Sequence, residues 1–420
     1  MPEQATRGPL YRALLERGVS RRAFLRFSAA MTAALALPPA YVAQVVGALE
    51  QAPRIPVIWR EGQDCAGNTE AFLRASDPSV TEILLDILSV DYHEVLMAPS
   101  GLAAEASMLS TMENFPDGYI LVIEGSIPTA EGGVYCTIGG RTFESIVREA
   151  AEHALAVIAV GSCAFDGGLP AAGAGPTGAV GVQALVPGAR IINLPGCPMN
   201  PANLTATIVH YLTFGRLPAT DTANRPYFAY GKLIHDQCER RSHFERGEYV
   251  LSWNDEGSRK AWCLYKMGCK GPATLANCPT IRFNEGTNWP VKAGHGCVGC
   301  TMSGFWDQMS PFYRRLPATP GFASDVTADQ LGVGLVAVVA GLTVAHGAAS
   351  YARRRRAVAR ERMAAVPAGA VTTAETPAAT AETRAPTAET PGVRDGPVDA
   401  EAPAGPEGHE KPEPTEGTDA

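Results

Sequence analysis

The stretch of residues 235–300 constrains this chain more than any other, because it concentrates side chains that bind soft metals. It contains six cysteines, and a histidine lies three residues before the first of them: His235, Cys238, Cys263, Cys269, Cys278, Cys297 and Cys300. Disulfide bonds and metal ligation are the two explanations. The H-x-x-C and C-x-x-C pairs place two donors on one turn, whereas disulfide partners are usually far apart in sequence. The spacing therefore favours metal, either zinc or iron–sulfur.

The donors fall into a group of four followed by a group of three. The first group is His235, Cys238, Cys263 and Cys269, and the second is Cys278, Cys297 and Cys300. Structural zinc sites use four protein donors. Three thiolates, with Pro290 where a fourth could sit, suit a cluster lacking one iron, such as a 3Fe–4S centre. The alternative is a zinc site with an open position, which would need a hydrolytic function that nothing else in the sequence supports.

The sequence W-P-V-K-A-G-H-G-C-V-G-C at residues 289–300, after H-x-x-C, C-x5-C and C-P, resembles the small subunit of NiFe hydrogenases. The resemblance extends over residues 55–312. It implies a distal 4Fe–4S cluster on His235, Cys238, Cys263 and Cys269, and a medial 3Fe–4S cluster on Cys278, Cys297 and Cys300.

Residues 54–214 alternate short apolar runs with helical patterns, which predicts an α/β domain with a parallel sheet. Strands are expected at residues 55–59, 119–123, 156–160 and 190–194, and helices at 80–90, 102–112, 143–153 and 201–213. Cys65, Cys163 and Cys197 each follow a predicted strand. Ligands bind beyond the carboxyl ends of such strands, so the three thiols should converge. The resemblance implies a flavodoxin-like fold here and a proximal 4Fe–4S cluster on these cysteines.

The fourth proximal ligand departs from the family pattern, in which the first two cysteines form C-x-x-C. Cys65 matches the first cysteine, but Asn68 stands in place of the second. An amide is a poor donor, so we expect the Asp64 carboxylate to bind instead, with Asp166 as the alternative.

Some oxygen-resistant relatives carry two extra cysteines near this cluster. The corresponding positions here are Gly67 and Gly168, so that device is predicted to be absent. The remaining cysteine, Cys136, is expected to be structural.

Residues 215–317 form a second, loop-rich domain in which metal binding and folding should be coupled. Lys266 and Lys270 flank the distal donors and are expected either to dock an acidic partner or to lie on a solvated surface.

Both ends of the chain carry targeting patterns. Residues 1–50 contain S-R-R-A-F-L at 20–25 and an apolar run at 27–37, which predict a twin-arginine export signal excluded from the mature fold. Residues 331–350 carry no charge and are followed by four arginines at 353–356, which predicts a transmembrane helix with its arginines in the cytoplasm and the catalytic part outside. Residues 364–420 have the composition of a disordered tail.

These features predict an electron relay rather than a catalytic centre. The net charge of −8, with no basic aromatic patch, argues against nucleic acid as a partner. The resemblance implies a large subunit that holds the NiFe site, three clusters that carry electrons from hydrogen oxidation, and a membrane cytochrome b or quinone pool as acceptor. A hydrogen sensor, a non-hydrogenase electron-transfer subunit and a zinc-stapled binding module are the alternatives.

Overall fold

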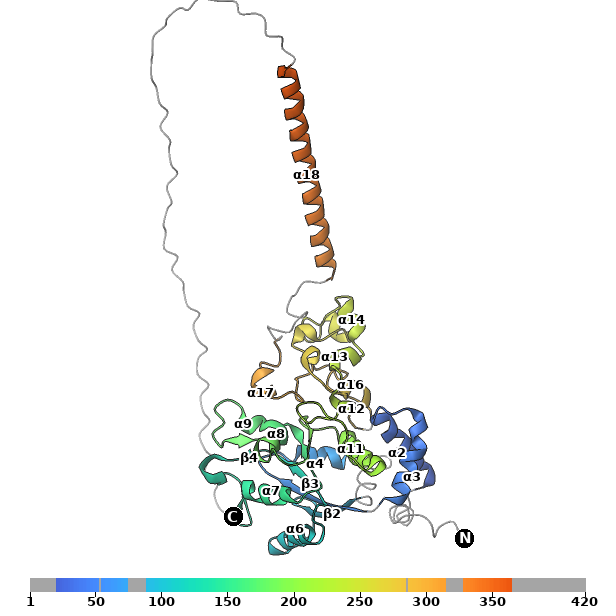
Figure 1. Ribbon diagram of the computed structural model, residues 1–420, viewed down its shortest axis with the longest axis vertical. Coiled ribbons are helices and arrows are strands. Elements are labelled where there is room, and N and C mark those ends of the chain that lie inside the picture. Colours follow the sequence, from blue (N-terminus) through green and yellow to red (C-terminus); the bar gives the residue numbers. More distant parts are fainter. Residues whose placement is uncertain (1–19, 53, 75–87, 285, 315–327, 365–420) are drawn as a thin grey trace, which may run out of the picture. The chain divides into compact units, whose positions relative to one another are not determined.

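The structure is a computed structural model that describes residues 20–52, 54–74, 88–284, 286–314 and 328–364. A five-stranded parallel sheet in the order β2-β1-β3-β7-β9 forms its central layer (Figure 1). Its strands are β1 (Ile55–Glu61), β2 (Leu88–His93), β3 (Ile120–Glu124), β7 (Ala156–Val160) and β9 (Ile191–Leu194). Numbered along the chain, this order is 2-1-3-4-5, which is the flavodoxin-like topology. The predicted α/β fold is confirmed.

Helices cover both faces of the sheet, and alternate strand residues point to opposite faces. In β3, Ile120 and Val122 belong to one hydrophobic cluster, whereas Leu121 and Ile123 belong to the other. The first cluster also holds residues of α2 (Arg21–Ala34), α3 (Val42–Gln51) and α11 (Pro201–Phe214), and the second those of α6 (Leu102–Asn114) and α7 (Phe143–Glu152). Burial on both faces explains why β7 is apolar throughout and why β1 and β3 are apolar up to their carboxyl ends.

The carboxyl ends of four strands lie level with one another. The pairing joins Glu61 to Glu124, Glu124 to Val160, and Val160 to Leu194. The loops that follow these residues therefore leave the sheet at one edge. Short helices begin there: α4 (Gly67–Leu73) after β1, and α8 (Gly161–Asp166) and α9 (Gly168–Ala171) after β7.

Helices α6, α7 and α11 confirm three of the predicted helices to within about two residues. The helix predicted over residues 80–90 is wrong at its end, because Leu88 begins β2; residues 80–87 lie outside the described chain. The edge strand β2 contains Asp91, whose carboxylate accepts hydrogen bonds from Ser89 and Thr111. These side-chain partners let a polar sequence form a strand that the apolar pattern did not reveal.

Residues 20–52, predicted to be a signal outside the mature fold, pack against the α/β domain in this full-length chain. Helices α2 and α3 lie beside α11 in Figure 1, with the short helix η1 (Pro39–Tyr41) between them. Phe24 and Leu49 are 1% and 0% exposed. Their apolar faces complete the cluster on that side of the sheet.

The loop-rich region begins after Gly215, which caps α11 in the left-handed conformation (φ +64°) that glycine adopts without strain. Among the described residues 215–314, no helix is longer than the five residues of α14 (Arg241–Glu245). The others are α12 (Tyr227–Tyr230), α13 (Ile234–Gln237), α15 (Glu256–Arg259), α16 (Cys278–Ile281), α17 (Phe305–Gln308), η3 (Tyr265–Met267) and η4 (Gly271–Ala273). The prediction of a loop-rich second region is confirmed.

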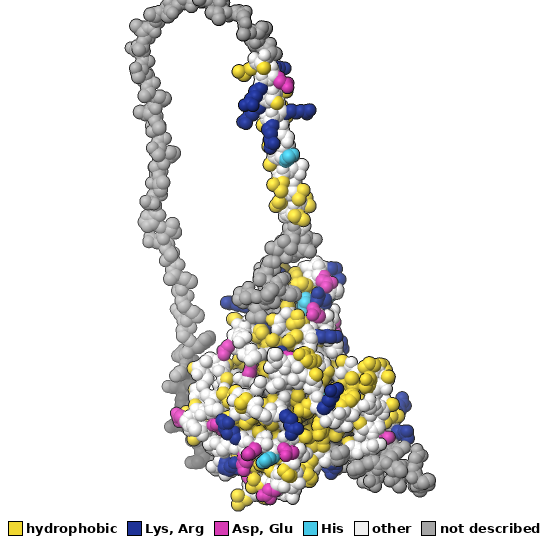
Figure 2. All heavy atoms as spheres, in the orientation of Figure 1, with side chains coloured by type: hydrophobic (Ala, Val, Ile, Leu, Met, Phe, Trp, Pro, Cys, Tyr) yellow, Lys and Arg dark blue, Asp and Glu magenta, His cyan; other side chains and the backbone are white. Residues whose placement is uncertain are grey.

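The helix α18 (Ala328–Ala364) runs through the predicted membrane span and its arginines. It is long and apolar enough to cross a membrane, and its residues from 332 onward are exposed. Figure 2 shows hydrophobic side chains along one part of this helix and Lys and Arg side chains along the next. Apart from residue 364, the predicted tail lies outside the described residues.

The remaining elements connect those above. They are the strands β4 (Ile127–Pro128), β5 (Thr137–Ile138), β6 (Arg141–Thr142) and β8 (Ala179–Val180), the helix α10 (Val182–Leu185) and the 3-10 turn η2 (Ala130–Gly133).

Candidate metal centres

The structure brings Cys65, Cys163 and Cys197 to the level edge of the sheet. Burial, together with the nearby charges of Cys197, Cys65 and Asp64, raises the pKa of the Cys163 thiol to about 11. Cys65 and Cys197 are exposed, whereas Cys163 is half-buried. The three thiols therefore form an open group on the surface of this chain, which we call the edge group.

Two glycines leave space beside these thiols. A Cβ atom added at Gly168 would lie 2.7 Å from the Cys163 sulfur, and one added at Gly67 would lie 3.0 Å from the Cys65 sulfur. Gly67 and Gly168 are the two residues that stand in place of the extra cysteines of some oxygen-resistant relatives. Any side chain there would intrude on the thiols, so the glycines preserve room for a bulky group.

Asn68 does not replace the missing cysteine as a metal ligand, because both polar atoms of its side chain already form hydrogen bonds within the protein. Its Nδ2 donates to Glu124 at 3.2 Å, and its Oδ1 accepts the amide of Met199 at 2.8 Å. Glu124 also accepts the backbone amides of Asn68 and Thr69. Asn68 therefore ties the loop after β1 to the end of β3 and to the loop that carries Cys197.

The two carboxylates considered as the fourth ligand are held differently. Both oxygens of Asp166 accept backbone amides, from Gly168 at 3.1 Å and from Gly304 at 2.5 Å. Asp64 uses Oδ1 to accept the amide of Ala66 at 3.0 Å. Burial and the charge of Glu124 raise the pKa of the Asp64 carboxyl to about 6. Its Oδ2 accepts no hydrogen bond within the described part of the chain, so Asp64 keeps an oxygen available to a metal, whereas Asp166 does not.

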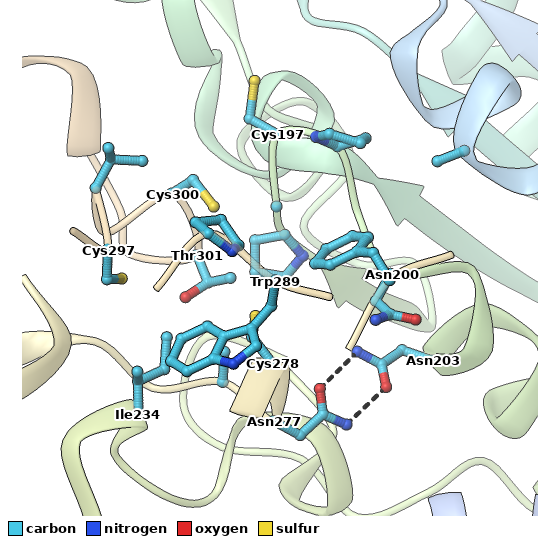
Figure 3. Close-up of a pocket in the computed structure, with 18 of the residues that line it drawn as sticks. Cys197, Asn200, Asn203, Ile234, Asn277, Cys278, Trp289, Cys297, Cys300 and Thr301 are labelled. Atoms are coloured by element: carbon cyan, nitrogen blue, oxygen red, sulfur yellow. Dashed lines mark hydrogen bonds between the residues drawn. The ribbon is translucent and has the colours of Figure 1, made fainter. Parts of the chain in front are cut away.

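A second thiol group lines a cavity of about 630 Å³ between the loop-rich region and the α/β domain, whose Cys197 lines the same cavity. Cys278, Cys297 and Cys300 line it together with Pro290, the residue noted where a fourth thiolate could sit, and Figure 3 shows these three cysteines around Trp289. Two amide hydrogen bonds between Asn203 and Asn277 fasten the residue before Cys278 to α11. We call these three cysteines the middle group.

His235, Cys238, Cys263 and Cys269 share one pocket, so the structure brings together all four donors predicted for the third group. We call them the outer group. The ring of Phe244 packs edge-on against His235, with centroids 4.6 Å apart. Burial lowers the pKa of His235 to about 4, so its imidazole is neutral and suited to bind a metal.

Hydrogen bonds link the three groups in a row. Ser162, beside Cys163 of the edge group, donates its hydroxyl to the carbonyl of Cys300 at 2.5 Å. On the other side of the middle group, the amide of Cys297 donates to the Cys269 sulfur at 3.3 Å. The middle group is therefore joined directly to the outer group, and to the edge group through Ser162, which precedes Cys163 in the chain.

The chemistry of these donors fits iron–sulfur clusters. Burial raises the pKa values of Cys263 and Cys278 to about 12, so these thiols stay protonated at neutral pH unless a metal takes the place of the proton. Cysteine thiols, with one neutral histidine in the outer group, are the ligands that iron–sulfur clusters take in proteins.

Cys136 and Lys270 lie outside the three donor groups, and the structure confirms the prediction for only one of them. Cys136 packs partly buried against the second hydrophobic cluster, as expected of a structural cysteine. Lys270 was expected on the surface or at a partner, and this is wrong: it is 2% exposed and donates to the carbonyls of Pro311 and Arg314. These acceptors lie 41 and 44 residues away, so sequence proximity gave no signal.

Fold and donor groups together define a small iron–sulfur protein with a flavodoxin-like domain. The family model for the C-terminal part of the NiFe/NiFeSe hydrogenase small subunit matches residues 230–313, and that for the NADH ubiquinone oxidoreductase 20 Kd subunit matches residues 65–211. An uptake hydrogenase small subunit of Afipia carboxidovorans is 45% identical over 345 residues, 82% of this chain and 94% of that one. The chain belongs to the NiFe hydrogenase small-subunit family.

Further relatives agree with this membership. The quinone-reactive Ni/Fe-hydrogenase small chain of Wolinella succinogenes is 43% identical and covers 80% of this chain and 97% of its own. The solved [NiFeSe]-hydrogenase of Desulfomicrobium baculatum matches with a TM-score of 0.59 and 35% identity, over 63% of this chain and 99% of that one. The actinobacterial-type NiFe-hydrogenase of Ralstonia eutropha has the same TM-score at 26% identity, covering 70% and 91%.

The chain is therefore the electron-transferring small subunit of a hydrogenase. Such small subunits pair with a large subunit, which contains the active site. Members of the family hold iron–sulfur clusters, in agreement with the donor chemistry above.

Proposed function

We propose that the three donor groups hold three iron–sulfur clusters that conduct electrons in series. A proximal 4Fe–4S cluster binds Cys65, Cys163, Cys197 and Asp64. A medial 3Fe–4S cluster and a distal 4Fe–4S cluster bind the middle and outer groups, respectively. When bound, the clusters supply one-electron redox chemistry, while the chain itself fixes their order. The observation that carries this proposal is the order of the three groups. Ser162, next to the edge group, donates a hydrogen bond to Cys300 of the middle group, and Cys297 of the middle group donates one to Cys269 of the outer group.

The direction of electron flow follows from exposure. The edge group is the exposed one, so it is the entry point from the large subunit that pairs with this chain. The outer group is the exit. Its neutral His235 replaces an anionic thiolate, which favours a higher potential than four thiolates would give.

We assign the acceptor to the membrane. The helix α18 anchors the chain, and the twin-arginine pattern at residues 20–25 directs the folded protein across the membrane. The relative from Wolinella succinogenes is described as quinone-reactive, and we extend this to a cytochrome b or quinone pool as the recipient of electrons from hydrogen oxidation.

Metal analysis tests the cluster assignment. The complex of this chain with its large subunit, purified from the membrane fraction, should contain nickel and, besides the iron of the NiFe site, about eleven irons with acid-labile sulfide. A well-folded sample without cluster iron and sulfide would refute the proposal. About eight irons besides that of the NiFe site, with no EPR signal of a 3Fe–4S centre, would remove the medial cluster alone.

The fourth proximal ligand is tested by a matched pair of variants. Asp64→Ala should change the EPR coupling and the iron content of the proximal cluster. Asp166→Ala should leave both unchanged, because both of its oxygens already accept backbone amides. The opposite pattern would transfer the assignment to Asp166.

A further inference from the structure

Residues 20–52 form a helical hairpin that is packed against the α/β domain on one face. A twin-arginine export signal does not by itself require such packing. In α2, buried positions recur at every third or fourth residue, which gives one stripe along the helix: Phe24, Phe27, Ser28, Met31, Thr32 and Ala34. Residues between them, including Arg22, Leu25 and Arg26, are exposed. One face of the export signal is therefore packed against protein, and the other faces solvent.

The polar residues within the buried stripe are satisfied without help from water. The Ser28 hydroxyl donates to the carbonyl of Phe24 at 2.9 Å, and the Thr32 hydroxyl donates to that of Ser28 at 2.8 Å. A buried hydroxyl with a partner costs little free energy, whereas one without a partner would oppose docking. The stripe is therefore compatible with a dry protein interface along its whole length.

The second arm of the hairpin closes the interface. Val45 and Leu49 of α3 are both 0% exposed and belong to the same cluster as Leu204 and Ile208 of α11. At the end of α11, the ring of Phe214 meets Tyr41 at 6.2 Å between centroids. Helix α11 is thus the surface on which both arms rest, as Figure 1 shows.

The arginine pair stays outside this interface. Arg21 and Arg22 are exposed at the start of α2, and Ser20 caps the helix by accepting the amide of Ala23 at 3.2 Å. The capped helix start presents both guanidinium groups to solvent while the apolar residues that follow are covered.

We propose that helix α11 is a docking surface for the chain's own export signal, which it holds in the folded precursor with its apolar face covered and its arginine pair free for recognition. The inference rests on the proposed twin-arginine function of this segment. Its physical consequence is that the apolar run leaves the protein only when a competing apolar environment displaces it from α11. The signal is docked only on a chain whose α11 is already folded against the sheet.

Hydrogen exchange of the full-length precursor tests the docking directly. The precursor is retained in the cytoplasm of cells lacking the twin-arginine translocase. It is studied in the least detergent that keeps it soluble, because excess micelles would compete with α11 for the apolar run. Amides of residues 21–51 should be protected. Leu49→Asp, which buries a charge in the interface, should speed their exchange by at least about tenfold. The matched variant Gln44→Asp on the exposed side of α3 should leave it unchanged.

A variant outside the signal separates docking from effects on the signal sequence. Phe214→Ala removes the ring that meets Tyr41 and should also speed exchange in residues 21–51, while that of β3 and β7 stays slow. Hairpin amides of the unsubstituted precursor that exchange like those of an unstructured peptide would overturn the proposal. Equal effects of Leu49→Asp and Gln44→Asp would do the same.

Export is measured separately. Replacing both Arg21 and Arg22 by Lys should block export yet leave hairpin exchange slow. Continued export of this double variant would refute the twin-arginine function, whereas the exchange data would still decide whether the hairpin docks.

Discussion

The α/β domain and the loop-rich region hold their donors by different means. In the domain, strands such as β3 and β7 are fully buried, and hydrophobic clusters on both faces fix the sheet. The cysteines merely follow strand ends that are level with one another. In the described part of residues 215–314 the helices are no longer than five residues, and the buried apolar side chains, such as Leu264 and Trp289, join the cluster on one face of the sheet. The α/β domain therefore positions its donors with a sheet that is buried on both faces, whereas the loop-rich region depends more on the donors and on what they bind.

Removal of iron should have the largest effect and should divide the two regions. After chelation under reducing conditions, we expect amide exchange in residues 215–314 to rise by about a hundredfold or more, because metal binding and folding are coupled there. Exchange in β3 and β7 should change by less than about tenfold. Hydrogen-exchange mass spectrometry checks this. Equal loss of protection in both regions would break the distinction.

A single ligand substitution should have the next largest effect. Cys297→Ser removes a thiol of the middle group. We expect the loss of the medial EPR signal with faster exchange around Trp289, which is buried and lines the same cavity as that group. Cys136→Ser is the matched control in the α/β domain and should leave iron content and EPR spectra unchanged. Loss of iron in the control would make Cys136 a ligand.

Lys270→Met sharpens the comparison by testing a protein-only fastening in the loop-rich region. The variant leaves the carbonyls of Pro311 and Arg314 without their donor, which should cost about 2–3 kcal/mol locally. Faster exchange in residues 305–314 would report this loss. The control Lys260→Met breaks an exposed pair with Glu256 and should cost less than about 1 kcal/mol. Similar effects of the two variants would show that the Lys270 contacts carry no stability.

The smallest effect is expected from a carboxyl group in the α/β domain. Burial raises the pKa of Glu61 to about 7, and the charges of Glu124 and Asp64 contribute. The protonated form is favoured in the folded state, so its contribution to stability is complete below about pH 4.5 and is lost as the pH rises through about 7. Glu61→Gln should therefore raise stability at pH 8 by on the order of 1 kcal/mol and flatten the decline. Thermal melts between about pH 5.5 and 8 check this, with Glu70→Gln as the exposed control. Parallel curves for Glu61→Gln and the unsubstituted chain would contradict it.

Most of the sheet could be predicted from the sequence, because strands buried on both faces are largely apolar, as β3 and β7 are. Strand β2 was missed since its Asp91 is satisfied by Ser89 and Thr111, and the sequence does not reveal such partners. The grouping of the donors followed from tight spacing around His235 and Cys300. Their arrangement in a row did not, because it depends on contacts such as that between Ser162 and Cys300, 138 residues apart.

The docked hairpin and buried Lys270 were also beyond the sequence for a shared reason. The apolar run of α2 is typical both of an export signal and of a helix packed in a core. Its packing in this chain depends on α11, which is distant in the sequence. A lysine between two ligand groups is ordinarily solvated, and only the folded position of residues 311–314 supplies its acceptors.

The exposure of Cys65 and Cys197 has a consequence for the order of biogenesis. Iron seated at that edge would meet dissolved oxygen and chelating metabolites until the large subunit arrives, whereas iron near the buried Cys263 and Cys297 would be shielded from the start. Damage in the lone small subunit should therefore begin at one end and advance inward. A cell that makes the two subunits in unequal amounts should therefore lose the surplus small subunit through oxidative damage at the exposed edge group.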